Sequence, residues 1–134
     1  MKYPVFYVDK LPVAGRANGP VIRILKTYRD DYGLFQHELT HVKQWFVIGL
    51  AFTIPPTMLA YLFGMRPLGL FGMTMFNVLY FFVDDFRLRA EVEAYRVQAK
   101  YYDDYRLDKF ASFIATRYKL SITQEEALKL LRGD

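Results

Sequence analysis

The sequence predicts a mainly α-helical single domain with a small N-terminal β region, a long antiparallel apolar helical hairpin bearing a metal site at its base, and C-terminal helices. Three observations carry this prediction. The first thirty residues hold short β-branched and aromatic runs, both histidines fall within five positions, and residues 45–83 contain one charged residue. At 134 residues the chain has the length of one domain, which we divide into 1–30, 31–102 and 103–134.

The β region is predicted from two runs, Val5–Val8 and Val21–Leu25, which are rich in residues favoured in strands. Between them, residues 15–20 contain two glycines and a proline, which is typical of a turn or loop. We therefore expect the two runs to pair as an antiparallel hairpin with a long loop.

Helices are predicted for most of the remaining chain. Asp30 and Asp31 offer an N-cap and a favourable charge at the start of a helix that continues through the two histidines. Thr123 is followed three residues later by Glu126, which forms a capping box at the start of a short last helix. Composition and apolar spacing place the C-terminal helices at about 84–102, from 103 or 104 to 118, and at 125–131.

The two histidines predict a zinc site. The chain has no cysteine, so any metal must be bound by imidazole and carboxylate groups. His37 and His41 are four residues apart, and on a helix this spacing places them on one face, about 5–6 Å apart at Cβ. Their imidazoles can hold one tetrahedral Zn²⁺, and Glu38 is placed to take a proton from a water that the ion activates. H-E-x-x-H on a helix is the pattern of zinc peptidases.

A catalytic zinc needs a third protein ligand, and in this chain it must be Asp or Glu. If the apolar segments form antiparallel helices that turn near Arg66, His41 lies 25 residues before the turn and Glu91 lies 25 after it. The two side chains then arrive at the same level. Glu93 is two positions further, and two positions turn a helix by about 200°, so Glu91 and Glu93 cannot both face the metal.

With these residues placed, the sequence resembles the gluzincin-type HExxH metallopeptidases, and most closely the membrane-embedded HtpX and CAAX prenyl protease group. In that group HExxH is followed, after apolar helices, by a Glu-x-Glu/Gln-Ala-Asp-type segment whose first Glu binds zinc. The resemblance covers about residues 30–100 and implies that Glu91 is a zinc ligand and Glu93 is not. Where the group has its Asp, which supports a zinc-bound histidine, this chain has Tyr95.

Tyr95 is therefore expected either to hydrogen-bond near a zinc-bound histidine or to stabilise the oxyanion, and Arg89 is a second candidate for the oxyanion role. In such peptidases an edge strand near the site also binds extended substrate. Val21–Leu25 leads directly into the metal helix and can serve in this way, or it can be a purely structural strand.

Residues 45–83 predict a membrane hairpin. Arg66 divides these 39 positions into 20 and 17 uncharged residues, which is close to the length that crosses a bilayer. Lys43, Arg87 and Arg89 flank the outer ends, against Arg66 alone at the tip. By the positive-inside rule, both termini and the metal site are then cytoplasmic.

One feature qualifies the hairpin. The pair Pro55–Pro56 lies in the middle of the first apolar segment and is expected to kink or break its helix. The alternatives to a spanning hairpin are a soluble cytoplasmic protein in which the hairpin is buried as core, and a hairpin half-inserted as a re-entrant loop. The aromatic run 80–82 is expected to serve packing. We expect membrane lipid as a partner. No nucleic-acid-binding module is recognisable, so we do not expect nucleic acid as a partner.

Together these patterns predict zinc-dependent peptide-bond hydrolysis, on a protein or peptide substrate, by a small membrane-associated HExxH metalloprotease. His37, His41 and Glu91 would bind Zn²⁺, and Glu38 would act as general base with Tyr95 assisting. The alternative is a non-catalytic membrane hairpin protein in which zinc only joins the ends of two helices. A third possibility is a membrane-remodelling hairpin that binds no metal.

Overall fold

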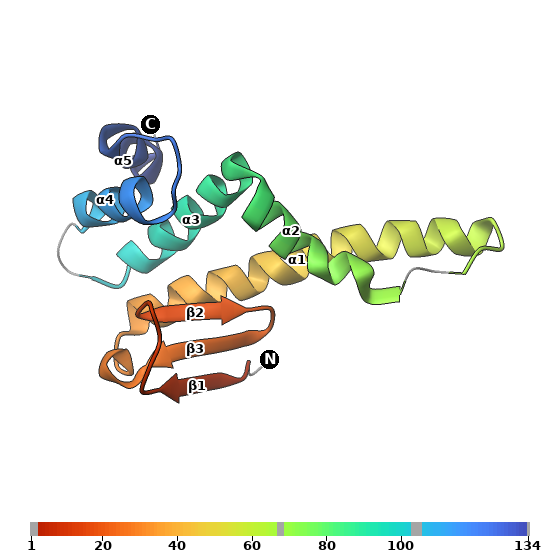
Figure 1. Cartoon of the computed structure of the whole chain (residues 1–134), viewed down its shortest axis with the longest axis horizontal. Coiled ribbons are helices and arrows are strands. Elements are labelled where there is room, and N and C mark those ends of the chain that lie inside the picture. Colours follow the sequence, from red (N-terminus) through yellow and green to blue (C-terminus); the bar gives the residue numbers. More distant parts are fainter. Residues whose placement is uncertain (1–2, 67–68, 103–105, 134) are drawn as a thin grey trace.

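The computed structural model describes residues 3–66, 69–102 and 106–133. It confirms a mainly helical chain with a small N-terminal sheet, and Figure 1 shows this sheet beside the first half of the longest helix. The elements in chain order are β1 (Val5–Val8), β2 (Gly15–Asn18), β3 (Val21–Leu25), η1 (Lys26–Tyr28), α1 (Tyr32–Leu62), η2 (Gly69–Thr74), α2 (Met75–Phe82), α3 (Asp84–Ala99), α4 (Leu107–Arg117) and α5 (Gln124–Arg132).

The sheet has three strands in the order β1-β3-β2. β2 pairs antiparallel with β3, and β1 pairs parallel with β3 on its other side. The predicted antiparallel pairing of Val5–Val8 with Val21–Leu25 is therefore wrong. The tight turn at Gly19, whose φ is 59°, pairs β2 with β3 locally, and this leaves β1 only the opposite edge. Ile22 and Ile24 of β3 are fully buried against α1 and fix the sheet to it.

α1 is one helix of 31 residues. The side chain of Asp31 caps it by accepting a hydrogen bond from the Leu34 N–H at 2.9 Å. The helix continues through Pro55–Pro56, so the proline pair does not break it. η2 lies against this region, and a Cβ added at Gly72 would overlap the Phe52 backbone. Such close neighbours allow proline within an apolar helix, because they cover the carbonyls that have lost a donor.

The second apolar segment differs from the prediction. It forms the short η2 and the eight-residue α2 rather than one long helix, and its expected start at Pro67 lies outside the described residues. Glycines at 69 and 72 disfavour a regular helix there. The distal half of α1, with η2 and α2 folded back along it, projects from the rest of the molecule (Figure 1). We call residues 45–66 and 69–82 the apolar arm.

The C-terminal helices pack on α3. Tyr95, Phe110 and Ile114 lie at the centre of this second core, whereas the first core joins the sheet to α1. α4 begins at Leu107, and the earlier start expected at 103 or 104 falls outside the described residues. The capping box at Thr123 is confirmed, since its side chain and that of Glu126 each accept a hydrogen bond from the other's backbone. The histidine segment lies between the two cores.

Candidate metal centre

The structure brings His37, His41 and Glu91 together from α1 and α3. The Nε2 atoms of the two histidines are 3.2 Å apart. The Glu91 carboxylate lies 3.6 Å from the Nε2 of His37 and 3.4 Å from that of His41. Ligand bonds of about 2.0–2.1 Å in a tetrahedral zinc site place the ligand atoms about 3.3 Å from one another. The three side chains therefore already have nearly the spacing that a zinc ion requires.

The burial of these groups also fits a metal. Glu91 is 1% exposed and His37 is 5% exposed, and the Oε2 atom of Glu91 is buried without a hydrogen bond. A buried carboxylate is costly unless a cation or hydrogen bonds compensate it. Two imidazoles and one glutamate are an established donor set for catalytic zinc, which keeps its fourth position open. Zn²⁺ thus matches both the chemistry and the spacing of the site.

Charge in this cluster is strongly coupled. Burial lowers the pKa of His41, but the Glu91 carboxylate outweighs this effect and raises it to about 9. Burial raises the pKa of Glu91, but His41 more than offsets this and the pKa falls to about 2. Burial, aided by the charge of His41, lowers the pKa of His37 to about 3. The metal-free cluster is therefore an ion pair of His41 and Glu91 beside a neutral His37.

Glu38 lies in the same buried region and reaches toward the sheet. Its side chain packs against Gly15 of β2, where an added Cβ would come within 2.8 Å of the Glu38 Oε1. Burial raises the pKa of Glu38 to about 7, although His41 and the backbone of Ala17 act in the opposite direction. A carboxyl group with a pKa near neutrality can take up and release a proton under physiological conditions, as a general base must.

Tyr95 is next to the site, but its hydroxyl points to another partner. Its ring contacts His37 edge-on, with centroids 4.4 Å apart, and its hydroxyl lies 3.0 Å from the Tyr118 hydroxyl. The expectation that Tyr95 would hydrogen-bond to a metal-binding histidine is therefore not met. Arg89 is exposed and does not line the cleft, so the structure does not bring it to the site.

Gln44 occupies the supporting position for which Tyr95 was considered. Its Oε1 lies 2.9 Å from the Nδ1 of His41, and its Nε2 donates to the carbonyl of Ala90 at 3.1 Å and to Glu93 at 2.8 Å. Such a bond fixes the orientation of an imidazole whose other nitrogen points to a metal. Glu93 is exposed and serves Gln44, whereas Glu91 faces the histidines. The sequence signal for Gln44 is its position three residues after His41, on the same helix face.

Tyr80 of α2 is a second contact that the sequence analysis did not single out. Its hydroxyl donates a hydrogen bond to the Oε1 of Glu91, and its ring lies edge-on to His41. In the sequence it belongs to an aromatic run that we assigned to packing. Phe76 stacks on the Tyr80 ring, so packing and a polar contact coexist at this position. Only the folding back of α2 onto α1 and α3 reveals the polar contact.

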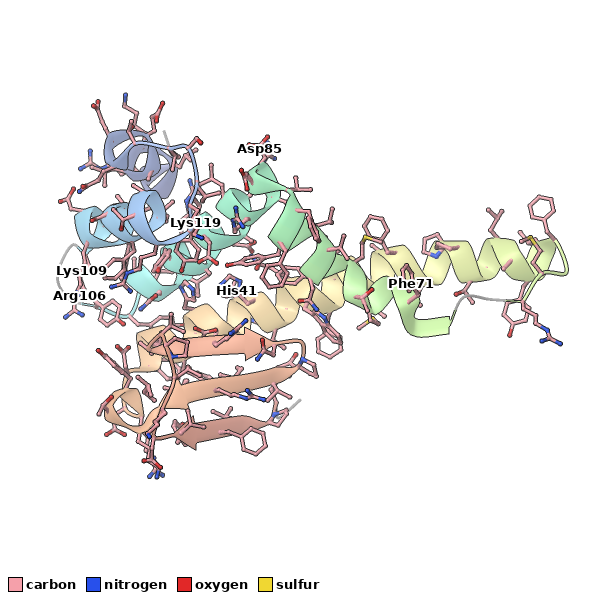
Figure 2. All side chains as sticks on the ribbon, viewed as in Figure 1. His41, Phe71, Asp85, Arg106, Lys109 and Lys119 are labelled. Atoms are coloured by element: carbon pink, nitrogen blue, oxygen red, sulfur yellow. The ribbon has the colours of Figure 1, made fainter. Side chains whose placement is uncertain are left out.

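A cleft of about 840 Å³ contains the site. Its lining includes His37, Glu38, His41 and Glu91 at the base, together with Tyr80 and Tyr95. The strand β2 contributes one wall, and residues of α4 contribute another. Figure 2 shows His41 in the middle of the molecule, between the sheet and the C-terminal helices.

Comparisons of this chain with protein-family models, with curated proteins and with solved structures give no match. The interpretation of the site therefore rests on the chemistry and spacing of its own residues.

Proposed function

We propose that this chain is a zinc-dependent peptidase. The observation that carries the proposal is the convergence of His37, His41 and Glu91 at tetrahedral spacing in the base of a cleft, with Glu38 beside them. Zinc held by these residues would supply an activated water and polarise the substrate carbonyl. Glu38 accepts the proton of the attacking water and passes it to the leaving amine, a role for which a pKa of about 7 is well suited.

The substrate would lie along β2. β3 is paired on both sides, so the expectation that Val21–Leu25 binds an extended peptide is wrong. β2 is an edge strand whose residues line the cleft, and the backbone of Ala17 hydrogen-bonds to Glu38. An edge strand offers hydrogen bonds to an extended peptide in any sequence. We therefore place the peptide between β2 and α4, with its scissile bond at the level of Glu38.

We further propose that the apolar arm inserts into a membrane. Within the described residues, α1 is the one helix long and apolar enough to cross a bilayer, and only 6% of its most apolar window is buried. Leu62 and Phe82 are more than four-fifths exposed. An apolar surface of this extent marks a membrane or protein interaction site. The basic residues that flank the arm favour a cytoplasmic location for the metal site.

The decisive experiment is the substitution Glu38→Gln, assayed on a mixed peptide library by mass spectrometry, with zinc content measured in parallel. The variant should keep zinc and lose hydrolysis by at least about 100-fold, the usual range of general acid–base catalysis. Glu125→Gln is the matched control, because it makes the same chemical change at an exposed position of α5 that does not line the cleft. Equal hydrolysis by the Glu38 variant and the parent protein would refute the peptidase mechanism.

The second candidate function is a zinc-stabilised hairpin without catalysis. It is favoured by the way the ligands join α1 to α3 at the base of the apolar arm. In that case removal of zinc would lower the melting temperature, and no peptide in the library would be cleaved by the zinc-loaded parent protein.

A further inference from the structure

One wall of the cleft carries a row of basic and aromatic side chains. Lys109, Phe113 and Arg117 follow at four-residue intervals along α4, so they share one face of that helix. All three line the cleft. The Arg117 guanidinium lies 3.7 Å from the centre of the Phe113 ring, and the Lys109 amine lies 5.8 Å from it. We call these three residues the α4 row.

The cations of the α4 row lie against an aromatic ring of their own helix. Among the residues that the structure describes, neither Lys109 nor Arg117 forms an ion pair with a carboxylate. Their interactions are instead with the Phe113 ring, which leaves their N–H donors available. Basic groups that line a cleft without a counter-ion attract an anionic ligand.

The acidic side chains inside the cleft have other roles. Asp31 caps α1 and accepts a hydrogen bond from the Tyr102 hydroxyl at 2.6 Å. Glu91 faces the two histidines, and Glu38 packs on β2. Within the described part of the chain, the acidic side chains that line the cleft are thus engaged elsewhere, which leaves the α4 row open to a negative charge on a ligand.

The α4 row is also close enough to the metal centre to act on the same ligand. Tyr95, whose ring contacts His37, stacks on Phe110 of α4 and lies near Phe113. Burial is the largest influence on the pKa of Tyr95 and raises it, and the charge of Arg117 is among the groups that lower it. The basic wall and the candidate ligands thus belong to one continuous site.

We infer that the α4 row is a specificity subsite that binds a carboxylate of the peptide substrate, so that the enzyme prefers sequences with an acidic residue near the scissile bond. This inference rests on the proposed peptidase function. Anionic lipid is the other source of negative charge. However, Lys109 lies near one end of the longest axis and Phe71 lies well along the arm toward the other (Figure 2), so a membrane around that part of the arm would lie away from Lys109.

The test uses zinc-loaded full-length protein and a set of fluorogenic peptides that differ at one position by Asp, Asn or Lys, moved in turn along the residues flanking the scissile bond. At one or more positions, Asp should give a kcat/KM about fivefold above Asn, the effect of one solvent-accessible ion pair, mainly through KM. Peptides with free and amidated C-termini separate a side-chain carboxylate from a terminal one. Equal cleavage of all the peptides would overturn the inference.

Charge reversal sharpens the test. The double variant Lys109→Glu and Arg117→Glu should prefer Lys over Asp at the same position, and the milder Lys109→Gln and Arg117→Gln should lose the preference. The matched control is Arg23→Glu with Lys100→Glu, which makes the same change in net charge at exposed positions outside the cleft lining. A shift of preference in the control as large as in the α4 variants would refute a local subsite.

Binding separates this inference from the proposed function. Fluorescence anisotropy with the zinc-loaded Glu38→Gln protein measures the affinity for the Asp and Lys peptides without cleavage. Tighter binding of the Asp peptide, lost in the α4 variants, supports the subsite even if no peptide is hydrolysed. If these variants instead lose flotation with phosphatidylglycerol vesicles while peptide preference is unchanged, the basic residues serve lipid and the inference fails.

Discussion

Gln44 on α1 donates a hydrogen bond of 2.8 Å to Glu93 on α3 while its carbonyl oxygen holds the Nδ1 of His41. This contact joins the orientation of one candidate ligand to the helix that supplies another. It also gives Glu93 a role that the sequence pattern alone does not suggest. The support for His41 thus comes from the amide of Gln44 and not from the side chain of Tyr95.

Replacement of this amide should weaken zinc binding without unfolding the chain. We expect Gln44→Ala to lower zinc affinity by about 10- to 100-fold, the usual effect of removing a group that orients a ligand. Competition with a chromogenic chelator measures the change. Glu91→Gln should lower the affinity further because it removes a ligand, whereas Glu93→Gln should have a small effect. Equal zinc affinity in Gln44→Ala and the parent protein would show that Gln44 does not support the zinc ligands.

Zinc binding should release a proton. In the folded, metal-free protein the Glu91 carboxylate raises the pKa of His41 to about 9, so this imidazole is protonated at pH 7.5. Zinc binds only the neutral imidazole. His37 is already neutral and Glu91 already ionised at that pH, because their pKa values are lowered to about 3 and about 2. Zinc affinity should therefore fall roughly tenfold for each pH unit below about 9.

Calorimetric titrations of zinc into the metal-free protein, run at pH 7.5 in two buffers with different heats of ionisation, measure this proton directly. About one proton per zinc is expected. A binding heat that does not depend on the buffer would show that His41 is neutral before the metal binds.

Substitution of Tyr80 should weaken zinc binding, whereas substitution of Tyr95 should lower folding stability. Tyr80→Phe removes the hydrogen bond to Glu91, so we expect zinc affinity to fall about tenfold. Tyr95→Phe breaks the contact with Tyr118 and should cost about 1 kcal/mol of folding stability, with zinc affinity unchanged. Chelator competition and thermal melts distinguish the two. A loss of kcat at constant KM in Tyr95→Phe would assign the oxyanion role to Tyr95. If Tyr95→Phe lost zinc affinity and Tyr80→Phe kept it, the roles of the two tyrosines would be exchanged.

The apolar arm provides a test of membrane insertion. An Asp at an exposed position in the middle of a membrane helix costs about 2.5–3.5 kcal/mol, so Met58→Asp should abolish flotation of the protein with lipid vesicles. Phe6→Asp on β1 is the control, because Phe6 is also exposed but lies outside the arm. If the Met58 variant floats as the parent protein does, the arm contacts something other than lipid.

The centre of the site follows from local rules. The spacing of His37 and His41 places them on one helix face in any fold that keeps the helix. The count of residues on either side of Arg66 singled out Glu91, although that count assumed two long apolar helices and the part of the chain that the structure describes has only one. η2 and α2 replace the second helix but still return the chain to α1, so α3 runs beside the histidines.

Other features depended on contacts between distant segments. A glycine turn produces β2 from residues that resemble a loop, and the sheet order follows from it. The partners of Tyr80 and Gln44 lie on α3, and no spacing within their own helices identifies those partners. The capping box at Thr123 needed no such contact, because both of its hydrogen bonds close within four residues.

If the apolar arm inserts into a bilayer as proposed, the unbroken course of α1 would fix the distance between that bilayer and the metal centre. The same rigid rod carries His41 and, four positions later, the first residue of the apolar arm, a rise of about 6 Å. A tilt that lipid imposed on the arm would pass to the histidines, because α1 has no break between them. The helix itself would then set how far from the bilayer surface a peptide bond can be cut.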